Sequence, residues 1–282
     1  MTVRVVTDST ADLPPALLKE LSITVVPLMV LFGEQSYRDG IDLTTDEFFQ
    51  KLVEDANFPT TSQPSVGALR EVYERLARDA DGIVSVHIGA NFSGTVAAAT
   101  MARDSLDTPC RIEVVDSEAT SLGLGFAAVA AARAAKAGAT LEEVAAAAKS
   151  IVPRQHLLVY LDTLEYARRG GRISRIEALV GSLLSLKAII SIHGEVTGVA
   201  RMRTRAAGLK KLFELALSYP NIEEVGIMHA TTPQDADLLA AWVRERLPGV
   251  PVSIVRLGST LGTHGGPGVM AMTVVEGEKT EA

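Results

Sequence analysis

Two short segments gather hydroxyl side chains of a kind that can hold an anion. One reads Asn91-Phe92-Ser93-Gly94-Thr95 and the other Thr60-Thr61-Ser62-Gln63-Pro64-Ser65. Ser93 comes just before a predicted helix, where free backbone N–H groups and the positive end of the helix dipole favour an anion. Helix capping is the simpler explanation of Ser93 and Ser65 taken alone. It does not explain why Thr61 and Ser62 precede Ser65.

A third segment places one histidine among glycines, in the sequence Gly262-Thr263-His264-Gly265-Gly266-Pro267-Gly268. The four glycines allow the backbone to approach a ligand closely. The imidazole can donate a hydrogen bond to a carboxylate. The alternative is a tight structural turn.

Ser93 and His264 also raise the alternative of a serine esterase or acyltransferase. The nucleophile elbow of such enzymes reads Gly-x-Ser-x-Gly. Here Asn91 and Thr95 occupy the two glycine positions, which lowers the case for a hydrolase.

Two arginine clusters stand out in an acidic chain. The first is Arg168-Arg169-Gly170-Gly171-Arg172 with Arg175, and the second is Arg201-Met202-Arg203-Thr204-Arg205. Strand alternation would place Arg201, Arg203 and Arg205 on one face. A solvated face is the default interpretation, and a local site for phosphate or an acidic partner is the alternative.

Metal and nucleotide chemistry find little support in the sequence. The five histidines are widely separated, and there is no Cys-x-x-Cys or His-Glu-x-x-His pattern. No Gly-x-x-x-x-Gly-Lys-Ser/Thr loop is present, and no Gly-x-Gly-x-x-Gly follows the first predicted strand. We therefore expect no bound metal and no cofactor.

Composition indicates a globular protein with a large aliphatic core. Of 282 residues, 47% are hydrophobic and only 5% aromatic, and the net charge is -7. This charge disfavours binding to nucleic acid or an anionic membrane surface. No stretch approaches the roughly 18–20 apolar residues of a membrane-spanning helix, although transient membrane contact stays open. The start of the chain lacks a secretory signal and Cys110 is alone, so we expect a cytoplasmic location.

The elements that must position these residues alternate between β-branched runs and helical patterns in the first half of the chain. Such alternation predicts a parallel sheet between two helical layers, a three-layer α/β/α domain over residues 1–153. Ligands of such sheets lie at the carboxyl ends of strands, where Asp8-Ser9-Thr10, residues 89–95 and Asp116-Ser117 fall. The expected strands are residues 3–7, 23–31, 83–88 and 112–115, and the expected helices are 14–21, 45–55, 66–78, 94–105, 120–137 and 141–151.

The second domain is expected over residues 154–282. A hairpin about His193-Gly194-Glu195 combined with helical crossovers predicts a mixed sheet in a two-layer α/β unit. The expected strands are residues 157–161, 188–192, 196–203, 225–229 and 252–257, and the expected helices are 206–217 and 234–247.

Five separated motifs taken together resemble the DegV family of fatty-acid-binding proteins, which includes the lipid-binding subunits of bacterial fatty acid kinase. The resemblance spans nearly the whole chain. Its motifs are Asp8-Ser9-Thr10-Ala11-Asp12-Leu13-Pro14, Thr61-Ser62-Gln63-Pro64-Ser65, Phe92-Ser93-Gly94-Thr95, Gly170-Gly171-Arg172-Ile173, and Gly262-Thr263-His264 with Gly266-Pro267-Gly268.

The resemblance implies a lipid carrier without catalytic machinery of its own. One long-chain fatty acid would lie between the two domains, and a separate ATP-dependent kinase subunit would phosphorylate its carboxylate to an acyl phosphate. A sugar-kinase or dihydroxyacetone-kinase component is a further alternative, because such proteins share the fold.

The resemblance also implies roles for individual residues. Thr61 and Ser93 would bind the carboxylate, with the Gly94 N–H, His264 and Ser62 as further candidates. Arg169 or Arg172, and Arg203 or Arg205, match basic positions suited to kinase docking or phosphate handling.

Overall fold

The computed structural model describes residues 2–172 and 187–278. The chain divides into two compact units. Unit 1 comprises Met1–Leu43 and Thr61–Pro153, and unit 2 comprises Thr44–Thr60 and Arg154–Ala282. One crossing between the units falls at the expected boundary, after Pro153. The segment Thr44–Thr60 groups with unit 2 although it lies early in the chain, which the sequence did not indicate.

Unit 1 is built on a four-stranded sheet whose order is β2-β1-β6-β7. All three pairings are parallel, as the alternation of strands and helices predicts. Every residue of β6 is buried, which explains why that strand reads as a continuous apolar run. The strands are β1 (Val3–Asp8), β2 (Ile23–Val26), β6 (Gly82–His87) and β7 (Arg111–Asp116).

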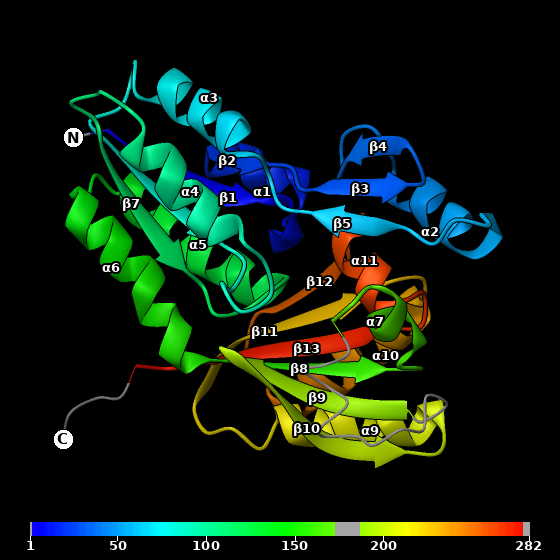
Figure 1. The fold of residues 1–282 in the computed structure, drawn as a ribbon. Coiled ribbons are helices and arrows are strands. Elements are labelled where there is room, and N and C mark those ends of the chain that lie inside the picture. The colour runs from blue at the N-terminus through cyan, green and yellow to red at the C-terminus, as the bar shows by residue number, and fades with distance from the viewer. Residues whose placement is uncertain (1, 173–186, 279–282) are drawn as a thin grey trace. The chain divides into compact units, whose positions relative to one another are not determined.

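Helices cover both faces of this sheet, as Figure 1 shows. Side chains of α3 and α4 form one core with β1, β2 and β6, while α5 and α6 pack together on β1, β6 and β7. The helices of unit 1 are α1 (Pro15–Glu20), α3 (Val66–Leu76), α4 (Thr95–Asp104), α5 (Leu122–Lys136) and α6 (Leu141–Ile151), with short 3-10 turns at η1 (Ser9–Ala11) and η2 (Val152–Arg154).

The expected strand over residues 23–31 is wrong as a single element. It ends at Val26, and β3 (Met29–Phe32) then joins a separate sheet of order β4-β3-β5, with β4 (Gln35–Arg38) and β5 (Thr60–Ser62). Pro27 separates the two strands, because a proline has no N–H to donate to a sheet.

Unit 2 is built on a six-stranded mixed sheet of order β10-β9-β8-β13-β11-β12. Only β11 and β12 pair in parallel, and β9 and β10 form the predicted hairpin. Helices α9 (Arg205–Ala216) and α10 (Pro233–Arg246) share a core with the sheet. The strands are β8 (Gln155–Leu161), β9 (Lys187–His193), β10 (Glu195–Met202), β11 (Ile222–His229), β12 (Val252–Arg256) and β13 (Met270–Glu276). The sequence did not predict β13.

Helix α11 (Ser259–Gly265) packs against two other helices of unit 2, α2 (Thr45–Glu54) and α7 (Glu165–Arg169). The glycine-rich segment around His264 is therefore a helix and not a tight turn. A β-carbon at Gly262 would come within 2.8 Å of the Phe48 and Phe49 rings, so glycine permits the close contact between α11 and α2.

A chain of buried polar groups joins the carboxyl ends of β1 and β6. Tyr73 of α3 donates to Ser85 Oγ at 2.8 Å, and Ser85 Oγ lies 2.7 Å from His87 Nε2. His87 Nδ1 lies 3.0 Å from Asp8, and the Ile88 N–H donates to the same carboxylate oxygen at 2.9 Å. Because Tyr73 donates to Ser85, the serine hydroxyl can donate to Nε2, which leaves the imidazole proton on Nδ1 to meet Asp8.

These hydrogen-bonded side chains lie where an α/β sheet usually binds its ligands. From β1 the polypeptide continues to the neighbouring strand β2 on one side of the sheet, and from β6 it continues to β7 on the other side. Ligands of such sheets bind near the carboxyl ends at this reversal. The loop that carries Ser93 leaves the sheet directly after the Asp8–His87 pair.

We expect Asp8→Asn to lower the free energy of unfolding by about 3–5 kcal/mol, because it removes a buried charge that accepts from His87, from the Ile88 N–H and from the Thr10 N–H and hydroxyl. Tyr73→Phe should cost about 1–2 kcal/mol through loss of its hydrogen bond to Ser85. Urea denaturation followed by circular dichroism measures both changes. Asp104→Asn, at a surface ion pair with Arg103, is the control and should change little. A loss below about 1 kcal/mol for Asp8→Asn would contradict the role of the carboxylate.

Candidate functional site

Ser93 lies at the amino end of α4 and is half-buried. Its hydroxyl shares a 2.8 Å hydrogen bond with the Thr95 hydroxyl and accepts the Thr95 N–H at 3.3 Å. Gly94 occupies the N-cap position without a side-chain cap. The first turn of a helix has N–H groups without an intrahelical partner, and beside the Ser93 hydroxyl such groups suit an anionic oxygen.

The Thr61 segment approaches the Ser93 segment within unit 1. A β-carbon on Gly94 would overlap the side-chain amide of Gln63, so glycine at this position permits the contact. Thr61 is half-buried and Ser62 is exposed, both on β5. The structure thus brings the segment of Thr61 and Ser62 against the segment of Ser93 and Gly94 through the Gln63–Gly94 contact, although the segments lie about thirty positions apart in the chain.

Ser65 has a different role from the hydroxyls before it. Its Oγ accepts the Ala68 N–H at 3.1 Å and caps α3. Gln63 belongs to the same motif, and it is the residue that meets Gly94. No local pattern in the sequence identifies that contact, because it depends on the packing of α3 beside α4.

His264 lies in the last turn of α11 in unit 2, against α7. A β-carbon on Gly170 would overlap its Nδ1 atom, and that nitrogen is shielded from solvent. Burial, followed by the positive charge of Arg172, lowers the pKa of His264 to about 3. The imidazole is therefore neutral at physiological pH and can donate one hydrogen bond without bringing a charge.

The first arginine cluster separates into two environments. Arg169 lies over the Phe58 ring at 4.1 Å from its centroid. Arg172 donates to the Gly170 carbonyl at 2.9 Å and is near enough to His264 to lower the pKa of its imidazole. Of the predicted pair, Arg172 is thus the one beside His264. Ile173 and Arg175 lie outside the described residues.

The second cluster separates more sharply. Arg205 donates to Asp235 at 2.7 Å, to the Gly268 carbonyl at 2.7 Å and to Thr232 at 2.9 Å. These bonds join the start of α9 to the loops around α10 and β13. Arg203 is exposed, and no ion pair involves it within residues 2–172 and 187–278. Arg205 holds the fold of unit 2 together, whereas Arg203 is available to a partner.

The buried chain in unit 1 has the connectivity of a serine-protease triad but not its accessibility. Ser85, His87 and Asp8 follow one another by hydrogen bonds of 2.7 and 3.0 Å, and each is 0% exposed. A substrate carbonyl cannot reach Ser85, so this trio carries no hydrolytic chemistry. Ser93 is bonded to Thr95 instead of a histidine within unit 1.

A search of the described residues finds no cluster of histidine, cysteine, aspartate or glutamate side chains fit to hold a metal ion. Among the same residues, no helix has the length and apolar character needed to cross a membrane.

Comparison with known proteins places the whole chain in one group. The model of the DegV family, described as a family of uncharacterised proteins, matches residues 2–277. A DegV domain-containing protein from Streptomyces coelicolor is 36% identical over 277 residues, which cover 96% of this chain and 98% of the relative.

Solved structures agree in fold and carry information on ligands. A DegV family protein from Thermus thermophilus, described by its fatty acid binding, has a TM-score of 0.88 at 32% identity and covers 98% of this chain and 100% of its own. A stearic-acid-binding protein from Eubacterium ventriosum has a TM-score of 0.88 at 26% identity, covering 97% and 98%. With the family model spanning the described fold from end to end, this chain belongs to the DegV family.

Proposed function

We propose that this protein binds one long-chain fatty acid and presents its carboxylate to a separate ATP-dependent kinase subunit, which phosphorylates it to an acyl phosphate. The observation that carries the proposal is the meeting of the Thr61 and Ser93 segments in unit 1 beside the open first turn of α4. Fatty acid binding by relatives that share the fold over the whole chain supports it.

In this proposal the carboxylate accepts hydrogen bonds from uncharged donors. Thr61, Ser93 and the Gly94 N–H provide them from unit 1, with Ser62 as a further candidate. His264 of unit 2 is a further candidate and would add a neutral donor. Donors without charge hold a carboxylate less tightly than an ion pair would, which suits a group that must later accept a phosphoryl group.

The tail of the ligand should determine affinity and the headgroup donors should determine orientation. Burial of about 14 methylenes contributes ~11 kcal/mol at ~0.8 kcal/mol each, before the costs of association. A hydrogen bond to a charged acceptor contributes only about 1.5–3 kcal/mol. The donors are still required, because an unpaired buried carboxylate is strongly unfavourable.

Kinase docking is assigned to one member of each arginine pair. Arg172 lies beside His264, and Arg203 is the exposed member of the second cluster. Arg205 is held in the Asp235 network and Arg169 stacks on Phe58, whereas Arg172 is chosen for its position beside His264, although it also donates to the Gly170 carbonyl. We therefore propose Arg172 and Arg203 as the residues that meet the kinase or its phosphate.

We expect organic extraction of the purified protein, followed by mass spectrometry, to yield about one fatty acid per chain. Delipidated protein should rebind palmitate or oleate, and it should not bind a triose in saturation-transfer NMR. Absence of any lipid together with failure to bind added fatty acid would refute the proposal. Binding of the triose instead would favour the sugar-kinase alternative.

We expect Ser93→Ala and Thr61→Ala to slow phosphorylation by the kinase subunit at least tenfold, because the carboxylate loses its orientation. Retention of lipid should fall much less, because the tail provides most of the affinity. Ser65→Ala is the matched control. Its hydroxyl caps α3, so this change should cost about 1 kcal/mol of stability and leave phosphorylation unchanged.

Equal phosphorylation rates in wild type and Ser93→Ala would exclude the headgroup assignment. The wild-type protein alone should not turn over an activated acyl ester. Turnover that disappears in Ser93→Ala would support the esterase alternative instead.

We expect charge reversal at Arg203 or Arg172 to slow phosphorylation at least tenfold while the bound lipid content stays that of wild type. Arg244→Glu, an exposed position on α10, is the matched control and should change the rate less than about twofold. Arg205→Gln should instead lower the thermal stability of unit 2, because it removes three hydrogen bonds. An unchanged phosphorylation rate in Arg203→Glu and Arg172→Glu would show that these arginines are solvated surface residues without a role in kinase docking.

A further inference from the structure

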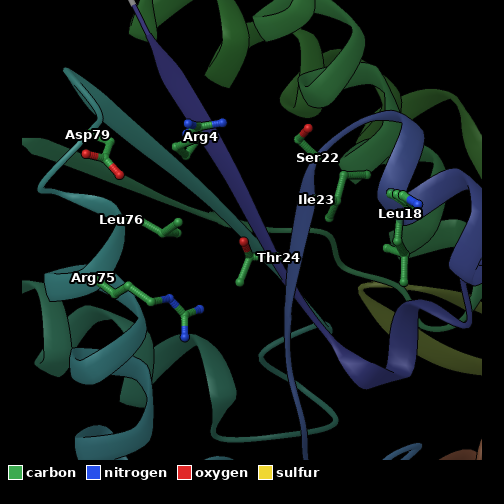
Figure 2. Close-up of a pocket in the computed structure, with 9 residues that line it drawn as sticks. Arg4, Leu18, Ser22, Ile23, Thr24, Arg75, Leu76 and Asp79 are labelled. Carbon is green, nitrogen blue, oxygen red and sulfur yellow. The ribbon is translucent and has the colours of Figure 1, made fainter.

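A pocket of about 450 Å³ opens at the amino-terminal edge of the parallel sheet in unit 1. Figure 2 shows it between the starts of two strands and the ends of two helices. Arg4 comes from β1, Thr24 from β2, Lys19 from α1 and Arg75 from α3. The Thr61 and Ser93 segments lie toward the carboxyl ends of the strands, so this pocket belongs to the opposite edge of the sheet.

The charge of the pocket is unusual for this protein. Three cationic side chains line it, Arg4, Lys19 and Arg75, against one carboxylate, Asp79. None of the three cations forms an ion pair within the described residues, although the carboxylate of Asp79 also lines the pocket. In a chain of net charge -7, three cations without a carboxylate partner around one hollow favour an anionic ligand.

Helix ends explain part of this charge but not all of it. Lys19 and Arg75 lie in the last turns of α1 and α3, where a cation offsets the partial negative charge of the helix end. Arg4 lies on a strand and has no helix end to offset. It is also partly buried, so its guanidinium lies at the pocket without a partner that would account for it.

Ser22 provides a second, independent indication. It follows the end of α1 with a φ of +54°, and its N–H donates to the Lys19 carbonyl at 3.3 Å. Glycine is the residue that best fits this left-handed position after a helix. The serine found there adds a hydroxyl to the pocket lining at the expense of backbone strain.

We propose that this pocket binds the phosphate group of a small phosphate monoester. Arg4, Lys19 and Arg75 approach from three elements, and the Ser22 and Thr24 hydroxyls add two donors. A tetrahedral phosphate presents three terminal oxygens in different directions and matches such a set better than a planar carboxylate does. The apolar lining side chains, such as Leu76, would contact the organic part of the ester. The site is independent of the proposed lipid site.

The test is calorimetric and NMR titration of the full-length protein with phenyl phosphate, inorganic phosphate and benzoate at low ionic strength. Phenyl phosphate should bind saturably at pH 7.5, and benzoate should bind at least tenfold more weakly. The affinity for phenyl phosphate should fall at pH 5, where the phosphate loses its second charge, since that ionisation has a pKa near 6. Benzoate that binds as tightly as phenyl phosphate would overturn the phosphate assignment.

Variants separate a binding role from a structural one. Arg4→Gln and Arg75→Gln should weaken phenyl phosphate at least tenfold, and Arg78→Gln, an exposed arginine just beyond α3 that does not line the pocket, should change it less than twofold. Ser22→Gly should weaken binding while the melting temperature stays the same or rises, because glycine relieves the backbone strain. Absence of saturable binding up to about 10 mM, or equal affinity in Arg4→Gln and wild type, would overturn the proposal.

Discussion

The carboxylate of Asp8 is the group on which the geometry of unit 1 depends. It is 0% exposed, and a buried charge without partners is prohibitively unfavourable. Four donors satisfy it: the Thr10 N–H and hydroxyl, His87 Nδ1 and the Ile88 N–H. Because these donors come from the ends of two neighbouring strands, the charge fixes where the chain leaves β1 and where it leaves β6. The loop that carries Ser93 begins at the end of β6, where His87 and Ile88 bind the Asp8 carboxylate.

Hydrogen bonding also separates three segments that look alike in the sequence. Asp8-Ser9-Thr10, residues 89–95 and Asp116-Ser117 all follow strands and all carry polar side chains. In the first, Ser9 donates to Asp39 and accepts the Leu28 N–H, and in the third, Asp116 accepts the Ala90 N–H. The polar side chains of both segments therefore have hydrogen-bond partners within the protein. Only residues 89–95 leave a half-buried hydroxyl beside a helix amino terminus, and no local pattern could have made that distinction.

The sequence predicts the elements whose burial follows a simple period and misses those that depend on tertiary contacts. The parallel strands appear as β-branched runs because both faces are covered. Strand β13 is also buried on nearly every residue, but it begins Met-Ala-Met, which lacks β-branched side chains and alternation. Helix α11 is rich in glycine, and local propensity argues against it. Gly262 is needed where Phe48 and Phe49 pack against the helix.

The sequence pattern of the arginines also does not reveal their partners, and the structure does. The expected alternation of Arg203 and Arg205 on one strand face is wrong, because β10 ends at Met202 and Arg205 begins α9. The partners rank them, since Arg205 makes three hydrogen bonds within unit 2 and Arg203 has no ion pair among the described residues. The same reasoning singles out Arg4 at the far edge of unit 1. Arg4 forms no ion pair within the described residues although its side chain is partly buried, and this combination favours an external anion beside it. The two edges of the unit 1 sheet then differ in charge: uncharged donors at the carboxyl ends would suit the carboxylate of the proposed fatty acid, and cations at the amino ends would suit the proposed phosphate.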